Sequence, residues 1–217
     1  MLPAIYHLIK KEIQLEWRQR TALGTILVYI LGSTFLIYLV FEGTTNNKTW
    51  VALFWVISLF TAINTLSRSF QKEANEQFYY WRNLVKPVSL ILAKIIYNSI
   101  LVTVLSVLIF GVMLLFFNQK IENKSLFLPL IICGSIGYSN LFTLLSAITA
   151  RTNNAVLLAI LGFPIILPLL LLIIKLTGLI DFSTTDNDIY LNFGIILLLD
   201  FITLLLSIIL FPYLWKD

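Results

Sequence analysis

Long apolar runs restrict this chain more than any other feature of its sequence. The chain is 59% hydrophobic and only 12% charged, with a mean hydropathy of +0.92. A soluble globular protein contains about 45–50% apolar and about 25% charged residues. A membrane-crossing helix needs roughly 20 mainly apolar residues, whereas barrel strands are shorter and alternate in polarity. The sequence therefore predicts an all-α membrane protein with a single membrane domain over residues 1–217.

Six apolar runs are long enough to cross a bilayer. We place these predicted spans at about residues 21–41, 50–67, 93–117, 126–150, 155–176 and 193–214. With the N-terminus inside, 11 of the 15 lysines and arginines fall in inner segments and 4 in outer ones. Because basic residues favour the cytoplasmic side, we expect both termini in the cytoplasm.

Residues 2–20 come before the first span and read as an amphipathic helix. Its apolar positions recur at helical spacing, and they are Leu2, Ile5, Tyr6, Ile9, Ile13 and Trp17. The remaining positions include Lys10, Lys11 and Arg18. We expect this helix to lie on the inner membrane surface. A positively charged start that serves only to set the topology is the alternative.

The longest inner loop, residues 68–94, combines charges with a run of aromatic side chains. Loops that face only water do not need adjacent aromatics, and large aromatics with arginine are typical binding anchors. One interpretation is a docking surface for a cytoplasmic partner, and the other is a headgroup belt at a helix end. The candidate contact residues are Lys72, Glu73, Phe78, Tyr79, Trp81 and Arg82.

Polar residues occur inside the fourth and sixth spans. Ser135, Ser139 and Thr143 lie on one stripe of the fourth span, where small hydroxylated residues favour close helix packing over a translocation surface. Asp200 is the only acidic residue well inside a span. Burying a carboxylate there costs several kcal/mol, so we expect Asp200 to face other helices. An ion pair with Lys175, or a protonated acid bonded to hydroxyls of the fourth span, is preferred to a proton relay.

The fifth span contains Gly162, Pro164 and Pro168. Each proline removes a backbone donor from the helix, so we predict a kink at this point. The kink suits a gating element, and a static bend that serves packing is the alternative.

Signatures of catalysis are missing from the chain. It lacks the glycine-rich phosphate loop of ATPases, the HExxH of metalloproteases and the GxSxG of serine hydrolases. The only histidine is His7 and the only cysteine is Cys133. We therefore expect no enzymatic activity, no bound metal and no pair of axial ligands for haem.

Three stretches make the chain similar to a known family. They are Leu8–Arg20 (LIKKEIQLEWRQR), the inner loop Arg68–Lys94, and Asn154–Leu172 with its paired prolines. Together they resemble the CcmB family, the haem-exporter permeases of cytochrome c maturation. The resemblance extends over nearly the whole chain, and the proline stretch is its most specific part.

The resemblance implies a six-span permease of the ABC-2 type in the bacterial inner membrane, with a coupling helix between spans 2 and 3. It also implies a homodimer within a larger complex. The expected partners are a CcmA-like ATPase, a CcmC-like haem-handling subunit and, indirectly, a CcmE-like haem chaperone. This chain would then bind no cofactor itself, because ATP and haem are handled by other subunits, and it would not bind nucleic acid. The alternatives are an ABC-2 permease for lipid or polysaccharide, a non-transporting membrane scaffold and, third, a membrane-embedded enzyme.

Overall fold

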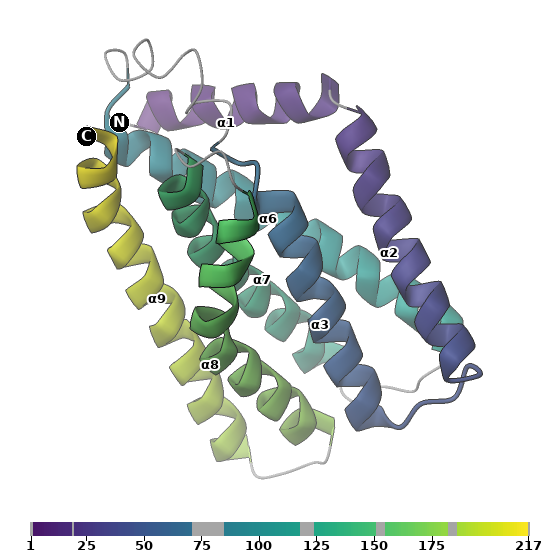
Figure 1. Ribbon diagram of the computed structural model, residues 1–217. Helices are drawn as coiled ribbons and strands as arrows, with labels where there is room; N and C mark the ends of the chain where they lie inside the picture. Colours follow the sequence, from purple (N-terminus) through teal and green to yellow (C-terminus); the bar gives the residue numbers. More distant parts are fainter. Residues whose placement is uncertain are drawn as a thin grey trace.

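In the described part of the chain the regular elements are all helices, with no strand (Figure 1). The computed structural model describes residues 2–18, 20–70, 85–117, 124–150, 155–181 and 186–216. The helices in these ranges are α1 (Leu2–Arg18), α2 (Arg20–Val40), α3 (Asn47–Leu66), α6 (Pro87–Phe117), α7 (Lys124–Thr149), α8 (Ala155–Asp181) and α9 (Asp186–Lys216). The all-α prediction is confirmed for these residues.

Five of the six predicted spans coincide with helices that are long and apolar enough to cross a membrane. These five are α3, α6, α7, α8 and α9. The remaining predicted span corresponds to α2, where the apolar stretch Gly24–Val40 is shorter. Its helix is 21 residues long, about the 30 Å of a bilayer core at 1.5 Å per residue.

The helices extend beyond the predicted limits at several ends. α6 begins at Pro87 instead of residue 93, α8 continues to Asp181 instead of residue 176, and α9 begins at Asp186 instead of residue 193. Residues 87–94, the last eight of the predicted inner segment 68–94, are therefore helical and belong to α6. Hydropathy marks the part of a helix that suits lipid, whereas a helix continues through polar residues, and proline is favoured at a first helical position.

Helix α7 occupies the centre of the bundle and packs against α6, α8 and α9 (Figure 1). In the apolar 18-residue stretch of α7, 67% of the residues are buried inside the molecule, against 17% in that of α9. Two glycines of α7 permit this packing. A Cβ on Gly134 would lie 2.7 Å from the Trp55 ring of α3, and one on Gly137 would lie 2.5 Å from Leu169 of α8. Neighbouring side chains therefore occupy the space that a larger residue would need.

Helix α1 lies across one end of the bundle, roughly at right angles to the long helices, and both chain termini lie at this same end (Figure 1). Leu8 is 7% exposed and packs on the bundle, whereas Tyr6 and Ile13 are 64% and 51% exposed. Ile5 and Ile9 pack against the same buried group as Leu8, so only part of the predicted apolar face contacts the bundle. Because Tyr6 and Ile13 point away from the protein, they are free to contact lipid.

Candidate functional site

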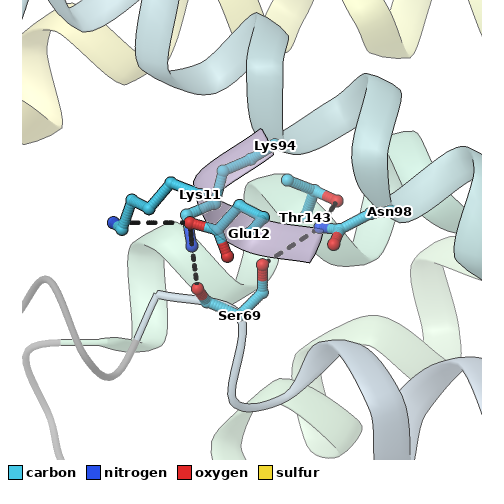
Figure 2. A network of polar contacts seen from close by, with 6 residues as sticks. All are labelled: Lys11, Glu12, Ser69, Lys94, Asn98 and Thr143. Carbon is cyan, nitrogen blue, oxygen red and sulfur yellow. Dashed lines mark hydrogen bonds and ion pairs between the residues drawn. The ribbon is translucent and has the colours of Figure 1, made fainter. Parts of the chain in front are cut away.

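Polar side chains from four segments meet where the inner loop joins the bundle (Figure 2). Glu12 comes from α1, Ser69 follows α3, Lys94 and Asn98 come from α6, and Thr143 comes from α7. We call these five residues the loop-base cluster. Ser69 lies just before residues 71–84, and Lys94 lies about two turns into α6, the helix that follows them.

Lys94 is the centre of the loop-base cluster. Its side chain is 2% exposed, and its ammonium lies 3.4 Å from the Glu12 carboxylate. The ammonium also donates a hydrogen bond to the Ser69 carbonyl and lies 4.9 Å from the centroid of the Phe70 ring. A buried charge is costly unless it is paired and hydrogen-bonded, and these contacts supply both. Lys94 therefore ties α1 and the start of the loop to α6.

Asn98 extends the cluster toward the bundle centre. It lies one helical turn after Lys94, so both side chains project from the same face of α6. Its amide nitrogen donates to Ser69 Oγ at 3.0 Å and to Thr143 Oγ1 at 2.8 Å. One side chain thus connects the loop base to the central helix α7.

Apolar side chains pack beside this polar cluster at the same end of the molecule. Phe70 is 2% exposed and its ring centroid lies 5.3 Å from that of Phe211 on α9, which stacks on Trp215 at 5.4 Å. Leu8 of α1 and Leu90 of α6 belong to the same buried group. Phe70 before the loop and Val85 after it therefore pack with residues of α1, α6 and α9.

The predicted partner-contact residues of the loop lie outside the described residues. These are Lys72, Glu73, Phe78, Tyr79, Trp81 and Arg82, within 71–84. Of the residues that flank this segment, Ser69 belongs to the loop-base cluster.

The polar stripe of α7 is buried against other helices. Ser139 Oγ donates to the Ile95 carbonyl of α6 at 3.4 Å, and Thr143 accepts the bond from Asn98. Ser135 is fully buried, and no described residue is a hydrogen-bond partner of its hydroxyl. These contacts join helices to one another, which favours the packing interpretation over a translocation surface.

Asp200 lies between helices α7, α8 and α9. The residue is 6% exposed, and neither carboxylate oxygen has a hydrogen-bond partner among the described residues. No ion pair joins it to Lys175, which is exposed on α8. The two partners expected from the sequence, Lys175 and the hydroxyls of α7, are therefore not the partners of Asp200 in this structure.

The three residues of the predicted kink have different surroundings. Gly162 is buried, and a Cβ there would lie 2.6 Å from the Phe142 ring of α7. Pro164 and Pro168 are exposed on the outer face of a helix that remains continuous from Ala155 to Asp181. The axis of α8 changes direction along its length (Figure 1). Gly162 thus packs against the centre of the bundle while the prolines face away from it.

Sequence reasoning missed three members of the loop-base cluster, namely Glu12, Ser69 and Asn98. Lys94 was noted only as part of the loop's end. A usable signal was present, because Lys94 and Asn98 are polar residues four apart at the start of an apolar run and so share a helix face. Their partners Glu12 and Ser69 follow only from the tertiary arrangement.

Replacing Asn98 by leucine tests the link between the loop base and α7. We expect Asn98→Leu to lower the free energy of unfolding by about 1–2 kcal/mol, because hydrogen bonds between membrane helices average about 0.6 kcal/mol each and reach about 1.7. Unfolding in detergent micelles measures the effect. Asn192→Leu is the matched control, because its amide bonds only to the Asp188 carbonyl of its own helix. Equal losses in the two variants would contradict the link.

One comparison identifies the chain. A family model described as CcmB protein matches residues 3–213, which include every residue of the loop-base cluster, and no curated protein matches the chain. This family implies haem transport and the biogenesis of c-type cytochromes. The match covers nearly the whole chain, and the apolar helices fit a membrane protein. The chain therefore belongs to the CcmB family.

Proposed function

We propose that this chain is the permease subunit of an ABC transporter for cytochrome c maturation. A separate CcmA-like ATPase binds the inner loop, and a CcmC-like subunit handles haem. ATP hydrolysis by the ATPase drives a movement of the permease that releases the haem-loaded CcmE-like chaperone. The chain itself hydrolyses no ATP and binds no haem, and it works as a homodimer within the complex.

The loop-base cluster carries this proposal. A permease that responds to an ATPase needs a rigid connection between the docking loop and the helices. Lys94 and Asn98 supply that connection, because they bond to Ser69 at the loop base and to α1 and α7 in the bundle. A push on residues 71–84 would then reach three helices through two side chains.

The placement of the chain in the membrane completes the proposal. We assign six spans, with α2 as the first, in the bacterial inner membrane. The end that carries α1, both termini and the loop-base cluster faces the cytoplasm, because most lysines and arginines belong to segments on that side. The exposed Tyr6 and Ile13 of α1 then lie at the headgroup level, where aromatic and apolar side chains are stable.

Co-purification with the ATPase subunit tests the docking assignment. We expect Trp81→Ala, and similarly Tyr79→Ala, to reduce the amount of ATPase retained by the tagged permease at least tenfold, because truncating a central aromatic anchor costs about 2 kcal/mol or more and 1.4 kcal/mol is a factor of ten. Tyr190→Ala is the control, since Tyr190 is an exposed aromatic at the opposite end of the bundle. Equal retention by Trp81→Ala and wild type, at equal membrane insertion, would remove the docking role.

Deletion of the gene followed by haem staining separates the proposal from its alternatives. We place the chain in cytochrome c maturation, so the deletion strain should lack c-type cytochromes, and wild-type chain should restore them. Normal c-type cytochromes in the deletion strain would instead favour an ABC-2 permease for lipid or polysaccharide. If the c-type cytochromes require this chain but no ATPase subunit, a scaffold is favoured.

A further inference from the structure

Asp200 is a buried acid that the proposed coupling does not use. It is 6% exposed, on the face of α9 that packs against α7 and α8. A Cβ on Gly137 would lie 2.5 Å from Asp200 Oδ1 and 2.5 Å from Leu169 Cδ2, so the carboxyl group sits against the α7 backbone beside a leucine. These neighbours offer the carboxyl group neither a positive charge nor a hydrogen-bond donor.

The polar atoms around Asp200 have an excess of acceptors. Asn140 of α7 donates its amide hydrogen to the Asp200 backbone carbonyl at 3.2 Å, and Thr203 donates to the same carbonyl at 2.9 Å. In the described chain, the buried oxygens Asp200 Oδ1, Asp200 Oδ2 and Asn140 Oδ1 have no donor. A ligand that satisfies them must bring a positive charge or a hydrogen-bond donor.

The surroundings favour a proton over a metal cation. Hard cations such as Ca²⁺ and Mg²⁺ require about six oxygen ligands. Here the Asp200 carbonyl already accepts two hydrogen bonds, and no group of three metal-binding side chains occurs in the described residues. A proton needs only one carboxylate oxygen, and it removes the charge that makes a carboxylate costly inside a membrane.

We propose that Asp200 is a proton-binding site of the membrane interior. The carboxyl group carries a proton while α7, α8 and α9 are packed as seen here. It releases the proton when α8 moves away and water reaches it. Leu169 lies beside the carboxyl group at Gly137 and directly follows Pro168 of the bent helix, so a movement of α8 at its prolines would open this side of Asp200. The site depends on helix packing alone and stands whether or not the chain couples to an ATPase.

Other titratable groups near this crossing do not substitute for Asp200. Lys94 of α6 is engaged with Glu12 and Ser69 at the loop base, and Lys175 of α8 forms no ion pair with Asp200. Other titratable side chains are described on α9 and on the helices that pack against it. They are Tyr97, Cys133, Tyr138, Asp188, Tyr190 and Tyr213. Those from α6 and α7 are phenols or a thiol, which are neutral at neutral pH.

Infrared spectroscopy of the purified full-length chain in dodecyl maltoside micelles, which contain no ester carbonyl, tests the proposal. A protonated carboxylic acid has a carbonyl stretch that is well separated from the bands of carboxylates and amides. We expect wild type to show this band at neutral pH and Asp200→Asn to lose it. Asp188→Asn is the matched control, because Asp188 is exposed near the start of the same helix and its replacement should leave the band intact.

Three other outcomes of this experiment bear on whether Asp200 binds a proton. Superimposable wild-type and Asp200→Asn spectra in this region, with both proteins folded, would show that Asp200 is ionised and would overturn the proposal. Loss of the wild-type band on addition of sodium, potassium, calcium or magnesium salts would assign the site to a metal cation instead. If Asp200→Asn does not fold, Asp200→Glu replaces it. The band should then shift in frequency, and an unshifted band would count against Asp200 as its source.

Discussion

Glu12→Gln is expected to destabilise the protein by about 3 kcal/mol, the lower end of the range for removing one partner of a buried ion pair. The substitution removes the carboxylate that faces Lys94 and keeps the size of the side chain. Lys94 is 2% exposed, so water does not readily replace that carboxylate. The bond to the Ser69 carbonyl and the contact with the Phe70 ring remain, which is why the lower end applies.

A double variant distinguishes a buried charge effect from a general packing defect. Replacing a whole buried ion pair by apolar groups is often nearly neutral, so Glu12→Gln combined with Lys94→Met should recover much of the stability lost in Glu12→Gln. Lys11→Gln is the matched control. Lys11 lies 3.5 Å from Glu12 but is 26% exposed, and a surface ion pair contributes only about 0–1 kcal/mol. Thermal or denaturant unfolding in micelles measures wild type, these three variants and Lys94→Met alone, and additive losses in the double variant would refute this account.

Gly134→Ala is expected to cost about 1–3 kcal/mol, the usual penalty for overfilling a packed interior. The added Cβ would lie 2.7 Å from two carbons of the Trp55 ring and 3.1 Å from Ile173 Cδ1. Trp55 cannot easily move away, because it is fully buried and its indole nitrogen donates to Thr177 Oγ1 at 3.0 Å. The centroid of its ring also lies 4.9 Å from that of Phe54. The change therefore separates α7 from α3 or breaks the bond between α3 and α8.

Gly111→Ala supplies the control for this prediction. Gly111 lies inside α6, and a Cβ there would meet nothing within 4 Å. Because glycine within a helix is less favourable than alanine by roughly 0.5–1 kcal/mol, Gly111→Ala should leave stability unchanged or raise it. The same unfolding measurement applies to both variants. If the two substitutions had the same effect, the close contact between Gly134 and Trp55 would not be what stabilises this crossing.

Parts of the fold were predictable from local sequence alone. The apolar runs located five helices that can cross a membrane, and the periodicity of residues 2–20 predicted the helix that became α1. Helix ends were less predictable. Residues 87–92 lie before the predicted third span, yet they belong to α6. A charge is compatible with a helix when a partner such as Glu12 is near, and hydropathy carries no information about partners.

The candidate site was likewise predictable only in part. Polar residues of the apolar runs could be noticed one by one, among them Asp200, Ser139 and Thr143. Their partners were not foreseen, since Asn98 bonds to Thr143, and Asp200 lies against Gly137 and Leu169 with no bond to Lys175. Residues far apart in the chain meet at positions that depend on how each helix is rotated about its axis. That rotation follows from the packing of all neighbouring helices together.

The amino-acid sequence by itself determined that this is a membrane protein built from helices, because a segment surrounded by lipid must satisfy its own backbone hydrogen bonds. Its order of apolar runs, its basic segments and its similarity to the CcmB family are equally properties of the sequence. Only the tertiary structure decided which polar groups share a site. It placed Glu12, Ser69, Lys94, Asn98 and Thr143 in one cluster and gave the Asp200 carboxyl group no donor among the described residues, because contacts between helices depend on distances in space that residue spacing does not contain.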